Sequence, residues 1–389
     1  MNRCPICTSE KYNTITKICS NLKIMGDFFE SGNVNIVSCQ ECGCCFLQSE
    51  NSQKNYLDYY TSGYARAPMY YNMFEEDEVN DYFEHIYLEI LKVSKEKANV
   101  LDFGGAWGEL AQYLSNRNPN WKVSVLDPNE KCNHTALEKN LKVIKASSVD
   151  FYEKIDEKYD VVIMNHIAEH IYNLEETMCY LKKILSDDGT VFFEIPNVEN
   201  YLSSIAPPYM YLTYEHVVHM SKEDVINLAE LTGYSIYNIK EYYKKVSNYP
   251  SICAILKPNK TSRHIVEKSD TEQYIKGYLQ VSNGEIQRAI NNISMISDQF
   301  VLWGIGASTT ILLDAVGENK IAMLVDSNQL KQGIVYKVGN SEYKVYSPEE
   351  IKDEKIPILI LSYAYKTSIR KTIEKMGIKN KVYSLDEEL

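Results

Sequence analysis

The sequence predicts an α/β protein in which a small cysteine-rich module precedes two α/β domains. Two C-x-x-C pairs lie within the first 45 residues, and two apolar strands run into glycine turns, at 100–104 and 301–304. The segments around both turns alternate between short apolar runs and helical periodicity, as in parallel sheets built from β–α–β units. We expect domains at 1–55, 97–257 and 270–389, with a linking segment and helix at 56–96.

Length and charge narrow the class of protein. A chain of 389 residues is long enough for two or three domains. Its formal net charge of −12 argues against a nucleic-acid backbone as the main partner, because phosphate binding needs a basic face. No apolar run approaches the ~18 residues of a membrane span, and no secretory signal is visible at the N-terminus. We therefore expect a cytoplasmic protein that acts on a small molecule and does not enter a membrane.

The N-terminal cysteines have the spacing of a metal site. Cys4 and Cys7 form one C-x-x-C pair, and Cys39 and Cys42 form the second. Two such turns can place four thiolates around one Zn²⁺ ion, and a four-sulfur site leaves no open position for substrate. The sequence thus predicts a structural zinc site. The neighbouring Cys44 and Cys45 are expected to be bystanders, although either could replace Cys42.

The remaining elements follow in order along the chain. A tyrosine-rich stretch at 56–71 precedes a helical stripe at 79–95. The central domain has expected strands at 100–103, 122–126, 142–144, 159–164 and 190–194. One expected helix ends near residue 116, and two others lie at 135–140 and 174–185. A turn is expected at 186–189. A linker at 257–268, a helix at 271–294 and strands at 300–303, 321–325 and 358–361 complete the list.

The first glycine turn resembles a known cofactor-binding turn. It reads Asp102-Phe103-Gly104-Gly105-Ala106-Trp107-Gly108; a carboxylate, Asp127, ends the second strand, and Glu169-His170 follows the fourth. This combination resembles the class I S-adenosylmethionine-dependent methyltransferases, although Ala106 stands where their middle glycine usually falls. The resemblance implies a Rossmann-like methyltransferase domain. The donor-binding candidates are Asp102, Gly104, Gly105, Ala106, Gly108, Asp127, Pro128, Ser148 and Asn165. A nicotinamide-dependent domain is the alternative for this segment, and for Asp127 the alternative is a solvated strand-end carboxylate.

Four of the seven histidines, at positions 166, 170, 216 and 219, follow expected strands on the ligand-binding side of the sheet. The whole layout resembles the nucleotide-deoxysugar C-methyltransferases, which join a zinc module, a methyltransferase domain and a C-terminal Rossmann-like domain. By this resemblance Glu215 and His216 match a Y-x-E-H loop, but Thr213 replaces its tyrosine and Tyr214 stands beside it.

The resemblance implies that His216 removes a proton beside a ketone, that Glu215 orients His216, and that His170 or Tyr214 stabilises the enolate oxygen. The resulting carbanion would take the methyl group of S-adenosylmethionine. A packing role for His216 is the alternative, and for the histidines at 166 and 219 it is the favoured one.

The second glycine turn, Gly304-x-Gly306 with Asp326 downstream, imitates a dinucleotide fingerprint. The resemblance instead gives this domain the role of closing the cleft and helping to hold the substrate diphosphate, and a purely structural role is also open. Three further functions stay open: methylation of oxygen or nitrogen in another small metabolite, a nicotinamide oxidoreductase using the second turn, and a non-catalytic binding module.

Overall fold

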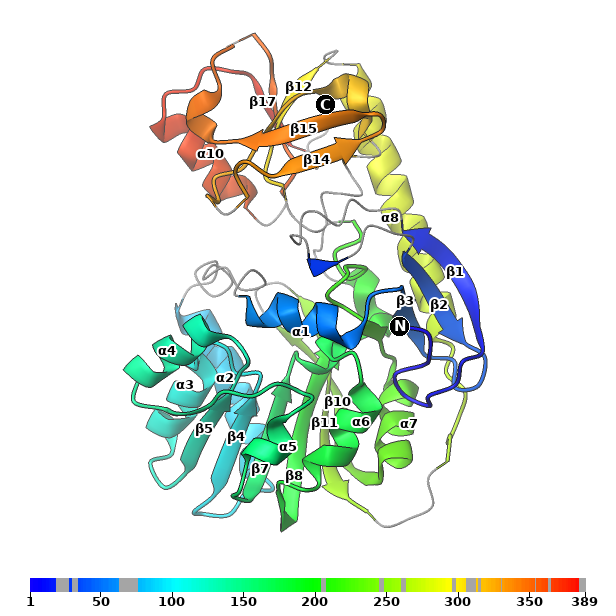
Figure 1. The fold of residues 1–389 in the computed structure, drawn as a ribbon, viewed down its shortest axis with the longest axis vertical. Helices are drawn as coiled ribbons and strands as arrows, with labels where there is room; N and C mark the ends of the chain where they lie inside the picture. Colours follow the sequence, from blue (N-terminus) through cyan, green and yellow to red (C-terminus); the bar gives the residue numbers. More distant parts are fainter. Residues whose placement is uncertain are drawn as a thin grey trace. The chain divides into compact units, whose positions relative to one another are not determined.

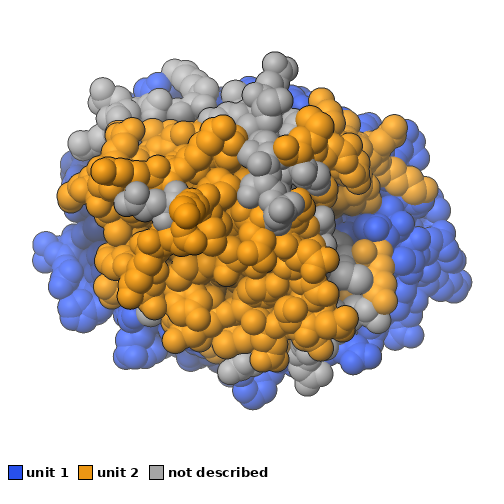
Figure 2. Space-filling view, turned by 90° about the horizontal axis from the view of Figure 1, so that it is seen from above, with its two compact units in different colours: residues 1–16, 35–205, 215–275 blue, residues 17–34, 206–214, 276–389 orange. Residues whose placement is uncertain are grey.

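The computed structural model divides into two compact units, coloured separately in Figure 2. The first comprises Met1–Thr16, Asn35–Ile205 and Glu215–Ile275, and the second Lys17–Val34, Ala206–Tyr214 and Lys276–Leu389. The described residues are 1–18, 28–29, 34–62, 76–203, 208–244, 248–259, 264–295, 299–305, 313, 316–329, 331–353, 355–362 and 365–384. Parts of the tyrosine-rich stretch and of the linker, and Gly306 of the second glycine turn, lie outside these residues.

The cysteine-rich segment forms a four-stranded sheet of order β1-β2-β3-β9 (Figure 1). Its strands are β1 (Tyr12–Ile18), β2 (Val34–Cys39), β3 (Cys45–Gln48) and β9 (Val218–His219). Strand β9 comes from far along the chain and pairs antiparallel with β3, with Cys45 opposite His219. Gly43, in the turn between β2 and β3, has φ +87° and donates its N–H to the Cys39 carbonyl at 3.0 Å. This left-handed position favours glycine.

The central sheet has seven strands in the order β10-β11-β8-β7-β4-β5-β6. Strands β8, β7, β4, β5 and β6 are parallel, and β11 runs antiparallel to both β8 and β10. Their bounds are β4 (Asn99–Phe103), β5 (Lys122–Leu126), β6 (Lys142–Ile144), β7 (Tyr159–Asn165), β8 (Leu185–Pro196), β10 (Tyr234–Lys244) and β11 (Tyr249–Pro258). This order confirms the predicted parallel α/β sheet of the central domain.

Helices cover both faces of the central sheet because its strands are apolar on both sides (Figure 1). One face packs α2 (Glu76–Leu91), α3 (Glu109–Arg117) and α4 (Glu130–Glu138) in a single apolar cluster. The other carries α5 (Phe151–Lys154), α6 (Leu174–Leu181) and α7 (Lys222–Thr232). Helix α1 (Gln53–Thr61) and the 3₁₀ helices η3 (Ala168–His170) and η4 (Val198–Ser203) complete this unit.

The second unit contains a six-stranded sheet of order β14-β15-β13-β12-β16-β17, parallel except for the edge strand β14. Alternate β12 residues enter two separate apolar clusters, Leu302 in one and Trp303 in the other, so both faces of this sheet are covered. None of the helices built from described residues is long and apolar enough to cross a membrane. The elements are α8 (Thr271–Ser294), β12 (Phe300–Trp303), η5 (Glu318–Lys320), β13 (Ile321–Val325), β14 (Val335–Val338), β15 (Ser341–Tyr346), η6 (Pro348–Glu350), β16 (Ile358–Ile360), α10 (Lys366–Lys375) and β17 (Val382–Ser384).

The structure corrects three expected boundaries. Residues 186–189 lie inside β8, where Tyr159 pairs with Leu185 and Val161 with Thr190, so the extra residues form an irregularity in the strand. Helix α4 begins well before residue 135, because the Asn129 side chain accepts the N–H groups of residues 131 and 132 as an N-cap. The expected linker starts too early, since β11 continues to Pro258.

Candidate functional site

The first glycine turn has left-handed backbone at three positions. Gly104 and Gly108 both have φ +76°, and Ala106 has φ +48°. Ala106 thus adopts the conformation that the family's glycine would have, at a strain cost of about 1–2 kcal/mol. A Cβ atom on Gly104 would lie 2.6 Å from the Ile167 Cδ1 atom. The turn therefore requires a residue without a side chain at position 104, because the Ile167 side chain packs directly against it.

Asp127 holds this turn from the neighbouring strand. Its Oδ2 atom accepts the Ala106 N–H at 3.1 Å, and its Oδ1 atom accepts the Asn129 N–H at 2.9 Å. The side chain is fully buried, so it is not the solvated carboxylate of the alternative interpretation. Asn129 in turn donates to the Tyr60 carbonyl at 3.2 Å, which connects α1 to the same loop. Contact between Asp127 and a bound ribose stays a prediction.

A pocket lies where β4, β5 and β7 end, beneath α1. Of the donor-binding candidates, Gly104, Pro128 and Ser148 line it. Asn165 instead has its Oδ1 atom bound by the Tyr82 hydroxyl at 2.6 Å, on the α2 side of the sheet. Asp102, Gly105, Ala106 and Gly108 shape the turn behind the lining. The complete lining consists of Gln53, Tyr56, Leu57, Tyr60, Phe103, Gly104, Leu126, Pro128, Ser147, Ser148, Ile167, His170, Ile171 and Tyr172.

Sequence reasoning missed the part of this pocket that α1 contributes. The tyrosine-rich stretch was visible, but nothing in its spacing showed that Tyr56 and Tyr60 would face the carboxyl ends of the central strands. The Ser52 cap at the start of α1 is the signal that could have identified a helix there, because Ser52 and Asn55 form a capping box.

His170 and His216 come together at the pocket edge. Their ring centroids lie 5.1 Å apart, and His170 also lines the pocket. The His170 Nδ1 atom lies 2.8 Å from the Glu215 carbonyl oxygen. Because a carbonyl oxygen can only accept, Nδ1 must carry the proton, and Nε2 is left to face other groups. These two histidines are therefore neighbours, and their catalytic roles stay predictions.

Glu215 does not point its carboxylate at the neighbouring imidazole. Its Oε1 atom accepts the hydroxyl of Tyr59, from α1, while its carbonyl is bound by His170. Glu215 therefore connects α1 to the histidine loop, and its expected role in orienting His216 or tuning its charge stays a prediction. Tyr214 belongs to the second compact unit, so its role at the enolate stays a prediction.

Burial makes the histidines of this loop weak bases. It lowers the pKa of His216 to about 4, and the charge of His170 acts in the same direction. Burial likewise lowers the pKa of His219 to about 3. His219 is fully buried, and its Nδ1 atom lies 3.1 Å from the Tyr201 hydroxyl, which fits the packing role favoured for it. His216 is consequently neutral at neutral pH, which is the state that a general base requires.

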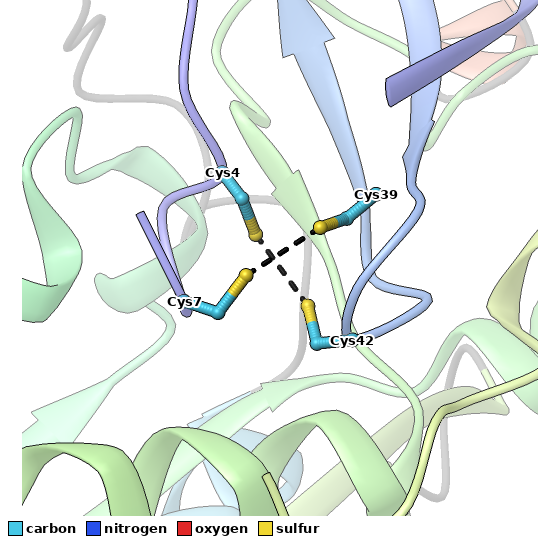
Figure 3. A group of neighbouring side chains, drawn as sticks. All are labelled: Cys4, Cys7, Cys39 and Cys42. Carbon is cyan, nitrogen blue, oxygen red and sulfur yellow. Dashed lines mark hydrogen bonds between the residues drawn. The ribbon is translucent and has the colours of Figure 1, made fainter. Parts of the chain in front are cut away.

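The four cysteines of the two C-x-x-C pairs converge on one point (Figure 3). The Sγ atoms of Cys4 and Cys42 are 3.6 Å apart, and those of Cys7 and Cys39 are 3.4 Å apart. A tetrahedral zinc ion with ~2.3 Å bonds to sulfur would place its ligands about 3.8 Å apart, so the thiol set fits zinc. The neighbouring Cys44 instead directs its Sγ atom toward the His219 carbonyl at 3.6 Å, outside the group.

Comparison with known proteins identifies the central segment, since residues 74–239 match the family model described as a methyltransferase domain. The match covers less than half of the chain, and it shows that this segment is similar to methyltransferase domains, which supports an enzyme. Residues 296–383 match a second model, described as C2185-like, N-terminal.

Among curated proteins, the methyltransferase resembles the mitochondrial ubiquinone biosynthesis O-methyltransferase of Dictyostelium discoideum, with 26% identity over 145 residues. This match covers 33% of the present chain and 44% of that relative's length.

Two solved structures also resemble the methyltransferase. The Burkholderia thailandensis 1,6-didemethyltoxoflavin-N1-methyltransferase is 11% identical, with 59% of this chain and 96% of that chain covered and a TM-score of 0.42. The plantazolicin methyltransferase BamL is 14% identical, with 52% and 94% covered and a TM-score of 0.43.

In the second unit, the methyltransferase repeats the carboxylate arrangement of its first glycine turn. Asp326 follows β13, and its carboxylate accepts the N–H groups of Ile305 and Asn328, each at 2.8 Å. Lys331 donates to the Ile305 carbonyl at 2.6 Å and lies 3.6 Å from the Asp326 carboxylate. As with Asp127, the strand-end carboxylate holds the turn in place.

Proposed function

We propose that the protein methylates a carbon atom of a nucleotide-linked keto-sugar, with His216 as the base that forms the enolate. One observation carries the proposal: the half-buried His216 lies beside His170, which lines the same pocket as Gly104, and burial lowers the pKa of His216. A donor bound over Gly104 would therefore have a base available nearby. The resemblance of the Glu215-His216 loop to the deoxysugar C-methyltransferases gives the substrate class.

We place S-adenosylmethionine in this pocket because its lining joins Gly104 of the glycine turn to Ser148, with Asp127 directly behind the turn. When bound there, this donor supplies an electrophilic methyl group on a positively charged sulfur. The protein's part is to orient the acceptor and to exclude water from the enolate.

Proton removal is the step that the side chains perform. A carbon beside a ketone becomes nucleophilic only after it loses a proton, which a nitrogen of His216 would take. The enolate oxygen then needs a hydrogen-bond donor. His170 can donate from Nε2 only when its ring is doubly protonated, because its Nδ1 proton is already bound to the Glu215 carbonyl. We assign this stabilising role to His170, with Tyr214 as the second candidate.

The two other parts of the chain have supporting roles in this proposal. Zinc held by Cys4, Cys7, Cys39 and Cys42 would be structural, because four thiolates fill its coordination sphere. The C-terminal α/β domain, as a Rossmann-like domain, would hold the diphosphate of the substrate. Lys331, a cation placed at the second glycine turn, supports an anion-binding role there.

The test separates proton removal from donor binding. Wild-type protein and His216→Asn are incubated in D2O with S-adenosylhomocysteine and a panel of nucleotide-linked keto-deoxysugars. We expect deuterium to enter the substrate beside the ketone in the wild type, and to enter at least ~100-fold more slowly in the variant. Calorimetry should give the same affinity for S-adenosylhomocysteine in both proteins. Wild-type exchange in the variant would remove His216 from the role of base.

Methyl transfer to oxygen is the second candidate. The match to the ubiquinone biosynthesis O-methyltransferase favours it, since that relative's name describes an oxygen acceptor. In this case the same experiment would show no deuterium at carbon, and methylated product would carry the new group on oxygen. Mass-spectrometric fragmentation of the product distinguishes the two outcomes.

A further inference from the structure

Two buried glutamates lie beside the two ring nitrogens of His166. The Nδ1 atom lies 3.3 Å from Glu169 Oε1, and the Nε2 atom lies 3.3 Å from both Glu194 Oε1 and the Ser251 Oγ atom. Both carboxylates are almost wholly excluded from solvent, with 2% and 0% exposure. Ionised groups in such places need a compensating charge or hydrogen bonds.

Hydrogen bonds do not supply this compensation for Glu194. Among the residues that the structure describes, neither of its carboxylate oxygens has a hydrogen-bond partner, and the same is true of Glu169 Oε2. A charged imidazole ring between the two carboxylates supplies the opposite charge that both need, and its Nδ1 atom also lies within hydrogen-bond distance of Glu169. The backbone of His166 adopts φ +49° to reach this position, a conformation that costs a non-glycine residue energy.

Glu169 also lies close to His216, the predicted base. Glu169, His170 and His216 each place one polar atom within 4.8 Å of the others. The main chain fixes the arrangement, because the Val217 N–H donates to the Glu169 carbonyl at 2.7 Å, one residue after His216. Glu215, the sequence neighbour of His216, is turned toward Tyr59 instead.

We propose that His166 is a buried imidazolium that holds Glu169 ionised against His216, and that Glu169 is the anion which stabilises His216 after it takes the substrate proton. The inference rests on the proposed function and names its positioning residues. In the step itself, the proton leaves the substrate carbon and binds one nitrogen of His216. The positive charge that forms there lies beside Glu169, whose own charge His166 has kept available.

The other charged groups around this cluster act in both directions. Burial and the nearby Lys244 lower the pKa of His166, but its contacts with Glu169 and Glu194 outweigh them and raise it. Burial opposes ionisation of Glu169, yet His166 and the charges of His170 and His216 bring its pKa down to about 2.

Four further groups face the cluster. Lys244, His85 and Cys253 lie near Glu194, and Lys244 also acts on Glu169. His216 is faced by Glu215 on its own loop, besides the residues named above. Lys244 is half-buried, and its ammonium group lies against the Tyr82 ring, 4.1 Å from the centroid.

The charge on His166 can be observed without any substrate. Protein carrying ¹⁵N-labelled histidine is titrated from pH 6 to pH 9, and long-range ¹H–¹⁵N spectra report how many ring nitrogens of each histidine carry a proton. We expect one histidine to keep both protons above pH 7 and to disappear in His166→Gln. Glu169→Gln should lower the pKa of that histidine by about one unit or more. A wild-type spectrum with no doubly protonated ring above pH 7 overturns the proposal and needs no variant.

A matched pair on the surface provides the control. Glu138 lies 3.3 Å from His134, as Glu169 does from His166, but these two side chains are 66% and 75% exposed. Glu138→Gln should therefore leave the spectrum of the buried histidine and the turnover unchanged.

Turnover then tests the role of Glu169 beside His216. In Glu169→Gln we expect methyl transfer to fall about 10- to 100-fold with unchanged affinity for S-adenosylhomocysteine, and Glu169→Asp to restore part of the rate. Wild-type turnover in Glu169→Gln would overturn the inference while leaving the proposed function intact. If no keto-sugar is methylated by the wild type, the proposed function fails, and the titration still decides whether His166 is charged.

Discussion

Replacement of Gly104 by alanine tests the construction of the donor pocket most directly. The backbone at this position has φ +76°, so any side chain there costs about 1–2 kcal/mol. The new methyl group would lie 2.6 Å from Ile167 Cδ1 and 2.7 Å from Cγ1, well inside normal carbon–carbon contact. Overpacking of this kind costs about 1–3 kcal/mol. The free energy of unfolding should therefore fall by roughly 2–5 kcal/mol.

The position of Ile167 adds a consequence for binding. Its side chain lines the donor pocket, so an Ile167 rotation that relieves the clash changes the shape of that pocket. If Ile167 does not move, we expect the whole decrease in the free energy of unfolding given above. If Ile167 rotates, we expect a smaller decrease and a weaker affinity for S-adenosylhomocysteine, by about tenfold for each 1.4 kcal/mol lost from the binding free energy.

Urea unfolding and titration calorimetry measure the two quantities on the same preparation. Gly277→Ala, in α8, is the control: no atom lies within 4 Å of the position that its new Cβ would take, and alanine should stabilise that helix by about 0.5–1 kcal/mol. A Gly104→Ala protein with wild-type midpoint and affinity would refute this account of the turn.

Three further predictions follow from the described contacts. Gly43→Ala would place a Cβ 2.0 Å from the Ser269 carbonyl oxygen, a backbone atom, so bound zinc measured by mass spectrometry should fall well below the one ion per chain expected for the wild type. Asp127→Asn should lose about 1–3 kcal/mol of stability together with donor affinity, because an amide has one acceptor oxygen for the two N–H groups that the carboxylate holds; an unchanged urea midpoint would contradict this. His219 has a pKa of about 3 in the folded state and an ordinary value when unfolded, so the unfolded chain binds more protons as the pH falls below about 6.5. Relative to His219→Asn, the wild type should lose about 1.4 kcal/mol of stability per pH unit between pH 6.5 and 4.5, and parallel stability curves would count against a buried neutral ring.

The sequence predicted what depends on local pattern. The bounds of α8 match the apolar spacing at 271–294, and β12 matches the apolar run at 300–303, because periodicity follows directly from secondary structure. The cysteine group was also predictable, since each C-x-x-C pair is a local turn. The residues at 186–189 misled for the same reason: Asp-Asp-Gly is typical of a turn, and only pairing with β7 keeps it within a strand.

Side-chain partnerships were harder to predict, because they depend on how distant segments pack. Glu169 is visible in the sequence as part of the Glu169-His170 pair. Its contact with His166 depends on the left-handed backbone of His166, directly after β7, which the sequence does not show. The contact of Glu215 could not be predicted, since the hydroxyl that binds it comes from Tyr59, more than 150 positions earlier in the chain.

The short strand β9 gives the first fifty residues a mechanical role. His216 is followed within three positions by Val218 and His219, which pair with β3, the strand between the cysteine turn and α1. A truncated chain that starts at α1 would lack β3, and β9 would lose the strand that it pairs with. The loop that carries His216 would then need another support.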